Sequence, residues 1–218
     1  MPKYLITKCL QWNELSQEQK AKIIDKNRDI RLDWLSNEDI IWEFSKAGNL
    51  IEEAGFRNPD VYYNYSCSQG DGACFECSEF NWELLLEDLN IPHKQLFIKL
   101  IENSPVITYN IKRPDCSYAN HYLHEKCRVF DIEYVSHHEV LRFDKIICRI
   151  VRHIESKRLQ LCLGAFSEIC KAIDWLQSDA CIIEELECRD WYYNEETLCV
   201  ENDTKLVSFG SCLVKEEK

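Results

Sequence analysis

Glycine, proline and methionine are scarce in this chain, and their scarcity excludes several classes of protein. The 218 residues include six Gly, five Pro and one Met. That composition argues against a collagen-like, low-complexity or disordered chain. No apolar run approaches the roughly 20 residues that a membrane-spanning helix needs, and the residues after Met1 lack the hydrophobic stretch and cleavage site of a signal peptide. We therefore expect a compact cytoplasmic protein that does not contact a membrane.

Basic residues are too few to balance the acidic ones. Lys and Arg number 26 against 38 Asp and Glu, which gives a formal net charge of −12 at pH 7 and an isoelectric point near 5.0. Sequence-independent binding to nucleic acid depends on many cations that neutralise phosphates. We therefore do not expect direct nucleic-acid binding, whereas a basic protein surface is a suitable partner.

Cysteine is abundant, with 13 residues spread from Cys9 to Cys212. They lie in segments that have the periodicity of ordinary helices and strands, and their number is odd. In a reducing compartment we expect most of them to serve as small hydrophobic residues rather than as disulfide partners.

Apolar residues recur at helical spacing near both ends of the chain. Ser16 and Gln19 form a capping box that predicts the start of the first helix, and a break is expected near Gly164 in the longest one. Helices are predicted over residues 17–29, 37–55, 82–89, 92–102, 140–177 and 179–188.

Strands are predicted mainly between these helices. Two aromatic stretches flank an Asp-Gly turn, which is a strong signal for a β-hairpin. The strands are predicted over residues 61–66, 73–77, 106–111 and 128–135, with an edge strand over 3–10 and a short hairpin formed by 198–200 and 206–209. The sequence therefore predicts a single α+β domain over 1–218, with an antiparallel sheet of about four strands on which the N-terminal and C-terminal helices pack.

The turn of the first hairpin contains Gln69, Gly70, Asp71 and Gly72. Glycines on both sides of Asp71 free the backbone, so that consecutive N–H groups can form an anion-binding nest with a carboxylate beside it. Alternatively, Asp and Gly are simply what a tight hairpin requires. No Gly-Lys-Ser/Thr follows, which excludes the common phosphate-binding loop.

A second group of polar residues precedes the last predicted strand of the sheet. His121, His124 and Glu125, together with Asp71, are candidate catalytic residues, with the imidazoles as general bases or ligands and the carboxylates orienting them. The alternative is a hydrogen-bonded loop that packs beside the aromatic hairpin. No Cys–His signature of a known protease type is present.

Zinc is a candidate cofactor. Cys74, Cys77, His121 and His124 supply four nitrogen and sulfur ligands if the hairpin and the histidine segment are neighbours. Residues three apart in a strand lie on opposite faces, so the strand has to end or bulge between the two cysteines. No cofactor is otherwise expected.

Two motifs resemble those of a family of uncharacterised phage and prophage proteins. Tyr65 to Phe75 reads Y-S-C-S-Q-G-D-G-A-C-F and is similar to the family's S-Q-G-D-G-A-[SC]-F hairpin, and His121 to Glu125 is similar to its H-Y-x-H-E stretch. Asn120 stands where the family has Gly, and Cys77 where it has a small residue. Family members are often described as antitoxins of toxin–antitoxin stability systems. The resemblance implies a protein of the bacterial host cytosol.

Acidic residues are concentrated near the C-terminus. Residues 179–203 hold nine carboxylates against the single cation Arg189, with three adjacent aromatic residues in their middle. Aromatic anchors inside a charged rim are typical of binding surfaces, although a solubilising surface around buried aromatics has the same composition. The candidate partner-binding residues are Glu184, Glu185, Glu187, Asp190, Trp191, Tyr192, Glu195 and Glu196.

Basic residues gather on one side of the long helix. Arg142, Lys145, Arg149 and Arg152 fall on one face at 100° per residue. The stripe can contact phosphates or an acidic partner, but the solvated face of an amphipathic helix is the simpler interpretation.

The resemblance implies a small phage-type accessory protein, and the acidic segment with its aromatic residues and the absence of a complete catalytic signature favour one that binds and blocks another protein. The expected partner is a host defence factor, a toxin or another bacterial protein, including one that binds nucleic acid. The alternative is a metal-assisted hydrolase or nucleotide-processing enzyme that uses Asp71, His121, His124 and Glu125. A structural or host-takeover role is a third interpretation.

Overall fold

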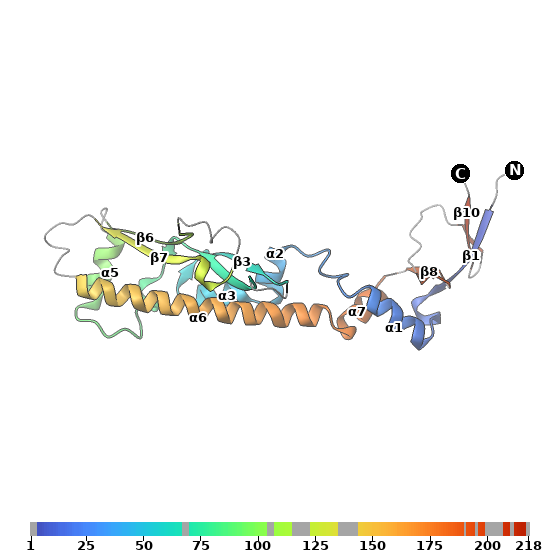
Figure 1. Cartoon of the computed structure of the whole chain (residues 1–218), viewed down its shortest axis with the longest axis horizontal. Helices are drawn as coiled ribbons and strands as arrows, with labels where there is room; N and C mark the ends of the chain where they lie inside the picture. Colours follow the sequence, from blue (N-terminus) through green and yellow to red (C-terminus); the bar gives the residue numbers. More distant parts are fainter. Residues whose placement is uncertain are drawn as a thin grey trace. The chain divides into compact units, whose positions relative to one another are not determined.

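The computed structural model describes residues 4–66, 70–103, 107–114, 123–134, 144–189, 191–194, 196–198, 207–209 and 212–216 (Figure 1). For residues 4–8, 134, 144, 207–209 and 212–216 it describes the backbone alone. The chain divides into two compact units: unit 1 comprises residues 1–36 and 173–218, and unit 2 comprises residues 37–172. The division does not test the predicted single domain, which stays a prediction.

Unit 1 contains two short helices, α1 and α7, that pack against each other. The predicted capping box is confirmed at the start of α1, where Gln19 N–H donates to Ser16 Oγ at 3.3 Å and Ser16 N–H donates to Gln19 Oε1 at 2.9 Å. The helical elements are the 3-10 helix η1 (Trp12–Glu14), α1 (Gln17–Lys26) and α7 (Asp179–Glu187). Capping therefore fixes the start of α1 as the sequence predicts.

The strands of unit 1 all connect to β1 (Tyr4–Gln11), directly or through a neighbour. Its first half pairs antiparallel with β10 (Cys212–Glu216) and its end with β8 (Tyr192–Asn194), while β9 (Val207–Phe209) pairs with β10. The predicted edge strand is therefore paired on both sides. The predicted partner of β9, residues 198–200, is not a strand at Leu198, and its other two residues lie outside the described ones.

The core of unit 1 lies between α1, α7 and the strand segments. Ile23 and Ile24 of α1 face Ile182 and Leu186 of α7, and Tyr193 of β8 packs against Trp12 with ring centroids 6.2 Å apart. The buried members are Trp12, Leu15, Ile23, Ile24, Ile30, Ile182, Leu186 and Tyr193.

Unit 2 is built along most of one long helix. The predicted break near Gly164 is wrong, because α6 (Asp144–Leu176) runs without interruption and only its residues from Ile173 onward belong to unit 1. Gly164 instead lets Leu50 approach: a Cβ at Gly164 would lie 3.2 Å from Leu50 Cδ2. Among the described helices, α6 included, none combines the length and apolarity needed to cross a bilayer.

The other helical elements of unit 2 are short. The predicted helix over 37–55 is interrupted, because its middle is a π-helical turn and Lys46 adopts a left-handed conformation at φ 56°. The elements are α2 (Asn37–Asp39), η2 (Ile40–Phe44), α3 (Ala47–Glu53), α4 (Trp82–Leu85), α5 (Lys94–Asn103) and η4 (Glu125–Cys127).

The strands of unit 2 form three separate antiparallel pairs, so the α+β class is confirmed and the predicted four-stranded sheet is wrong. Both predicted pairs exist, but one isolated bridge between Cys77 and Ile111 joins them instead of a continuous ladder. The pairs are β2 (Phe56–Arg57) with β5 (Glu79–Phe80), β3 (Asp60–Asn64) with β4 (Gly72–Glu76), and β6 (Ile107–Lys112) with β7 (Val129–Tyr134).

An aromatic cluster holds these small sheets together. Phe80 lies at its centre, with its ring centroid 5.1 Å from Tyr109, 5.4 Å from Trp82 and 5.8 Å from Phe130. Phe56 joins Phe80 at 5.6 Å. Because these rings come from β2, β5, β6, β7 and α4, side-chain packing replaces the hydrogen bonds that a continuous sheet would provide.

A buried ion pair fixes α6 to the strands of unit 2. The side chain of Arg158 is 1% exposed; its Nε and Nη2 donate to Glu155 at 2.9 and 2.6 Å, and its Nη1 donates to the carbonyl of Glu125 at 2.6 Å. Glu155 also accepts from the backbone N–H of Phe130 at 3.1 Å. One helical turn of α6 thereby contacts both η4 and β7.

A second arginine of unit 2 is also completely buried. Arg128 Nε lies 2.7 Å from Glu76 Oε1, its Nη1 donates to the carbonyl of Cys127 at 2.8 Å, and its guanidinium carbon lies 5.2 Å from the centroid of the Tyr62 ring. Its Nη2 has no hydrogen-bond partner among the described residues. The carboxylate of Glu76 is therefore what makes burial of this cation tolerable.

Replacing Glu155 by Ala is expected to lower the free energy of unfolding by about 3 kcal/mol, because it leaves the buried Arg158 without its carboxylate. The matched control is Glu168→Ala on the same helix, which removes an exposed pair with Lys171 and should cost less than about 1 kcal/mol. Urea denaturation followed by circular dichroism measures both. Equal losses for the two variants would contradict the role of the Arg158 pair.

Candidate functional site

An arginine in contact with two tryptophan rings is the most distinctive surface feature of unit 1. The guanidinium carbon of Arg189 lies 4.4 Å from the ring centroid of Trp191 and 5.5 Å from that of Trp34. The side chain of Trp34 is 73% exposed. Both distances fall within the range of cation–π contacts, so the arginine orders two aromatic side chains at the surface.

One carboxylate orders this arginine and a second one. Glu185 accepts from Arg189 Nε at 2.7 Å and also from its Nη2, and it accepts from Arg31 Nε at 3.0 Å. The hydrogen bonds from Arg189, with those from Arg31, lower the pKa of Glu185 below its ordinary value. Arg31 in turn lies 6.0 Å from the ring centroid of Trp175, which is 48% exposed. We call Trp34, Trp175, Trp191, Arg31, Arg189 and Glu185 the Trp–Arg cluster.

Local backbone structure brings the cluster together from three segments. After α1 the chain continues in turns, in which Trp34 N–H donates to the carbonyl of Arg31 at 3.1 Å. This turn places Arg31 and Trp34, three residues apart in the sequence, on the same side of the segment. Arg28 secures the same segment by donating to the carbonyl of Gln177 at 3.2 Å and by pairing with Asp179. The cluster is therefore tied to the start of α7 rather than carried on a free loop.

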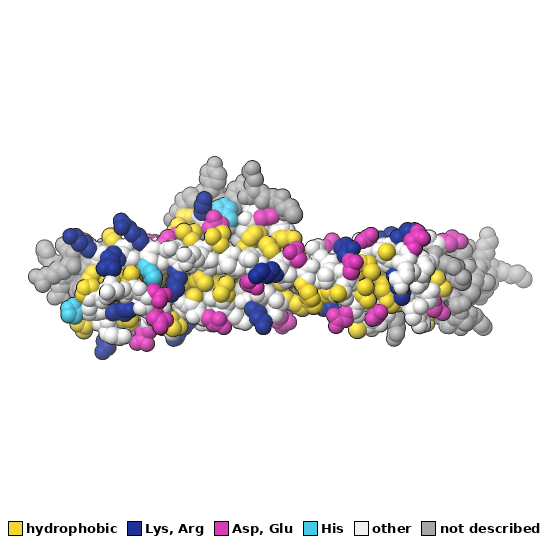
Figure 2. All heavy atoms as spheres, turned by 90° about the horizontal axis from the view of Figure 1, so that it is seen from below, with side chains coloured by type: hydrophobic (Ala, Val, Ile, Leu, Met, Phe, Trp, Pro, Cys, Tyr) yellow, Lys and Arg dark blue, Asp and Glu magenta, His cyan; other side chains and the backbone are white. Residues whose placement is uncertain are grey.

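Carboxylates outnumber cations on the described surface of unit 1. Figure 2 shows acidic, basic and hydrophobic side chains interleaved on one face of this unit. Glu14, Glu18, Asp25, Asp29, Asp33, Asp174, Asp179, Glu184, Glu185, Glu187 and Glu196 are set against Lys20, Lys22, Lys26, Arg28, Arg31 and Arg189.

Each of those six cations already has a partner within unit 1. Lys20 lies over Trp12, Lys22 pairs with Glu18, and Lys26 donates to the carbonyl of Thr197. The three arginines pair with Asp25, Asp179 and Glu185. The net charge that these described side chains present to an external partner is therefore negative.

Two adjoining pockets lie beside the cluster. The first has a volume of about 300 Å³ and is lined by Gln11, Trp12, Asn13, Glu187, Arg189 and Trp191. The second has a volume of about 430 Å³ and is lined by residues of α1 and α7, Glu187 among them, together with Trp12 and Arg28. Trp12 and Glu187 line both pockets, so the two adjoin at these side chains, and we call the pair of pockets the groove.

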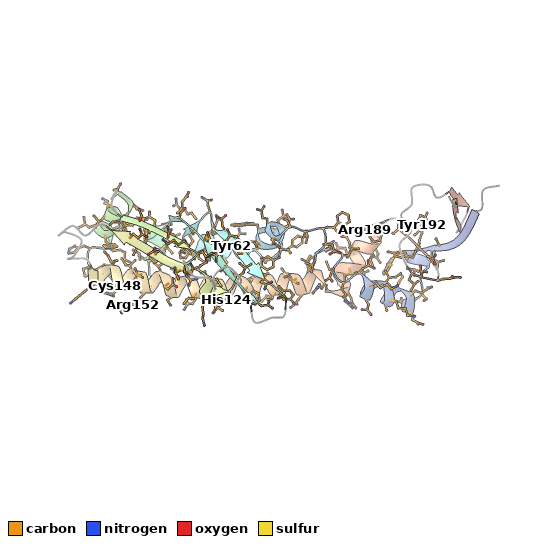
Figure 3. The ribbon with its side chains drawn as sticks, turned by 45° about the horizontal axis from the view of Figure 1, so that its top comes forward. Tyr62, His124, Cys148, Arg152, Arg189 and Tyr192 are labelled. Carbon is orange, nitrogen blue, oxygen red and sulfur yellow. The ribbon has the colours of Figure 1, made fainter. Side chains whose placement is uncertain are left out.

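The predicted partner-binding residues take different positions in this structure. Glu184, Glu187 and Glu196 are exposed, whereas Glu185 is committed to the two arginines. Tyr192 lies in β8, where its hydroxyl accepts from Gln11 Nε2 at 3.2 Å (Figure 3). Trp191 stacks on Arg189, and Asp190 and Glu195 lie outside the described residues.

Sequence reasoning missed the part of the cluster that comes from the N-terminal segment. Arg31 lies 154 residues from Glu185 in the sequence, so no local pattern connects them. One signal in the sequence could have indicated this contact. Arg28, Arg31 and Trp34 recur three residues apart, and residues 179–203 form an acidic stretch with a single arginine that two further arginines can neutralise.

The glycine turn and the histidine segment lie against each other in unit 2. A Cβ at Gly72 would lie 2.7 Å from the Cβ and 2.8 Å from the Cα of His124, so only a glycine allows this approach. Asp71 Oδ1 accepts from both the N–H and the hydroxyl of Ser66 at 2.9 Å, which closes the hairpin. Gly70 is buried, and Gln69 lies outside the described residues.

His124 has a capping position at the start of η4. Its Nδ1 accepts from the backbone N–H of Lys126 at 3.2 Å and lies 4.0 Å from Glu125 Oε2. Both side chains are about one quarter exposed, at 27% and 24%. The predicted set is thus partly brought together, with His124 and Glu125 adjacent and Gly72 against them, while His121 lies outside the described residues.

The described members of the predicted zinc set do not form a metal site. Among the described residues, no three His, Cys, Asp or Glu side chains are placed to hold a metal ion. The strand does end between the two cysteines, but the thiol of Cys77 points at the carbonyls of Arg57 and Glu79, at 3.2 and 3.1 Å. Burial raises the pKa of Cys74 to about 12 and that of Cys77 to about 11, so both thiols are protonated near neutral pH.

The basic stripe of α6 is partly used inside unit 2. Arg149 donates to the carbonyl of Asn90 at 3.1 Å, Lys157 donates to that of Leu84 at 3.3 Å, and His153 Nε2 lies 3.0 Å from that of Leu85. These contacts satisfy carbonyls at and after the end of α4. Arg152, beside Cys148, points away from β6 and β7 (Figure 3), Lys145 is exposed, and Arg142 lies outside the described residues.

No protein-family model, curated protein or solved structure matches this chain. The choice between the two candidate sites therefore depends on their geometry. In unit 1, exposed aromatic side chains are ordered by a shared carboxylate beside a groove. In unit 2, the described polar side chains of Asp71 and His124 form hydrogen bonds that close a turn and cap a helix.

Glu185→Gln is expected to make the free energy of unfolding of unit 1 less dependent on pH in the acid range. The lowered pKa of Glu185 means that its stabilising contribution is complete above the ordinary glutamate value of 4.5 and is lost as the pH falls through the lowered pKa. The stability difference between the natural chain and the variant should therefore shrink in that range. Thermal unfolding followed by tryptophan fluorescence, from neutral pH down to about pH 3, measures it.

The control for that comparison is Glu184→Gln, one residue away and exposed. Its stability should stay parallel to that of the natural chain over the same range. If both variants follow the same pH dependence, the shared carboxylate does not hold the Trp–Arg cluster.

Proposed function

We propose that this chain is a binding protein that blocks another protein, and that it does so through the Trp–Arg cluster and the carboxylates around it. The observation that carries the proposal is the contact of Arg189 with the rings of both Trp34 and Trp191 while its guanidinium pairs with Glu185. Tryptophan and arginine are the residue types most enriched among those that dominate binding energy.

Order in the free chain makes this surface suited to binding. Side chains that become immobilised on association cost about 0.5–1.5 kcal/mol each. Arg189 and Arg31 are already fixed by Glu185, and their guanidinium groups lie against three tryptophan rings. These side chains are therefore already ordered when unit 1 folds, so binding a partner loses little further side-chain entropy. The exposed ring of Trp34 remains available for contact.

The charge of the surface selects the class of partner. Carboxylates outnumber cations among the described side chains of unit 1, so the field outside the cluster is mainly negative. A basic protein surface fits this field, and a nucleic-acid-binding protein is basic for its own function. The resemblance to phage and prophage proteins favours a host defence factor or a toxin as the partner.

A metal-assisted hydrolase remains the second candidate function. The observation that favours it is the contact of Gly72 with His124, which sets the Asp71 turn against the segment that begins with His124 and Glu125. This candidate also needs His121, and it predicts that loss of the histidines abolishes function.

Trp34→Ala is expected to weaken binding to a blocked target by about 30-fold, the effect of losing one dominant interface residue. The chain is mixed with purified candidate defence nucleases and toxins, and binding and inhibition are both measured. Leu96→Ala is the matched control, because Leu96 is 67% exposed but lies on α5 of unit 2. It should bind as the natural chain does.

The variant His124→Ala separates the two candidate functions. A binding protein that uses unit 1 should tolerate this change, whereas an enzyme that uses unit 2 should lose activity. Inhibition that survives Trp34→Ala but is lost in His124→Ala would overturn the proposal, as would a full candidate panel in which nothing binds or is inhibited.

A further inference from the structure

The groove beside the Trp–Arg cluster has an apolar floor between α1 and α7. Ala21 and Ile24 of α1 and Ile183 of α7 line its larger part. Since α1 has ten residues, it is about 15 Å long. A short helical segment of another protein matches that length and can set apolar side chains on this floor.

A cation already occupies one point in the groove. Lys20 Nζ lies 5.2 Å from the centroid of the Trp12 ring, and Trp12 Nε1 donates to Glu187 Oε1 at 3.3 Å. All three residues line the larger pocket. The ring face, with the carboxylate at its edge, therefore makes a seat for a positive charge. In the free state Lys20 lies over the ring face without forming an ion pair with Glu187.

The charges along the groove determine what can enter it. Arg28 is neutralised by Asp25 and Asp179 on the groove wall. Glu187 has no cation partner among the described side chains, although it lines both pockets. An entering cation gains a carboxylate, whereas an entering phosphate or acidic side chain is repelled by it.

We infer that the groove between α1 and α7 takes a basic amphipathic helical segment of the partner, with one lysine or arginine replacing Lys20 over the Trp12 ring beside Glu187. This inference rests on the proposed function and gives the partner's chemistry in more detail: apolar side chains on one face, and at least one cation beside them. Lys20 acts as an internal competitor that has to leave the seat.

The test uses a fluorescent peptide with Leu and Lys at helical spacing and a matched peptide with Glu in place of Lys, and it measures fluorescence anisotropy. The Lys peptide should bind and the Glu peptide should not. Glu187→Gln should weaken binding of the Lys peptide by about tenfold, because the seat loses its charge. Lys20→Met should strengthen it, because the competing cation is gone while an unbranched side chain of similar length remains.

Glu184→Gln is the matched control, because Glu184 is also an exposed carboxylate of α7 but lines neither pocket. Its effect should stay within about twofold, as expected for a rim charge. Equal weakening by Glu184→Gln and Glu187→Gln would show diffuse attraction and overturn the inference. Binding of a single-stranded DNA oligonucleotide in place of the Lys peptide, or weaker peptide binding by Lys20→Met, would overturn it as well.

Failure of the groove can be distinguished from failure of the proposed function. If the peptide does not bind but Trp34→Ala still weakens inhibition of a target, the groove inference is wrong and the Trp–Arg cluster stands. If the peptide binds through Glu187 but Trp34→Ala leaves inhibition unchanged, the proposed use of the cluster is wrong.

Discussion

A buried arginine needs a carboxylate partner, because burial of an unpaired charge is costly, and both units are organised around such ion pairs. In unit 2, Arg158 is 1% exposed and Arg128 is 0% exposed, and each lies beside one glutamate, Glu155 or Glu76. The Arg158 pair reaches two other elements through backbone groups of Glu125 and Phe130. It thereby fixes α6 to strands that do not form a continuous sheet.

In unit 1 the same constraint acts nearer the surface and prepares it for contact. Arg31 and Arg189 share Glu185, and each is less than one quarter exposed. Because both guanidinium groups are flat and held in place, tryptophan rings can lie against them without being buried in the core. The ion pairs that hold α7 to the segment after α1 therefore also order the exposed rings of Trp34 and Trp175.

Local signals in the sequence were sufficient for much of the fold. Ser16 and Gln19 form the predicted cap, and the predicted strand pairs of unit 2 are β3 with β4 and β6 with β7. The arrangement of those pairs could not be predicted, because it depends on aromatic packing around Phe80 and on a bridge at Cys77. Gly164 was misjudged for a related reason, since its role is to admit Leu50 and not to end a helix.

Part of the candidate site lies in the stretch that composition marks as a partner-binding surface, and that role stays a prediction. Glu185 of α7 and Trp191 after it were named from composition, but Arg31 and Trp34 join them only through tertiary contact. Composition also counted Glu185 as available to a partner, whereas it is the internal acceptor of two arginines. Charge that is concentrated in the sequence is thus partly neutralised by residues from the other end of the chain.

The six tryptophans provide the most direct test, because their indole N–H signals are distinct reporters in a ¹⁵N-labelled chain. A target protein that the chain inhibits is titrated in, and the six signals are followed. Signals of Trp34 and Trp191 in the Trp–Arg cluster should shift or broaden, while those of Trp42 and Trp82 in unit 2 stay in place. Shifts confined to Trp42 and Trp82, with the cluster unaffected, would contradict binding through unit 1.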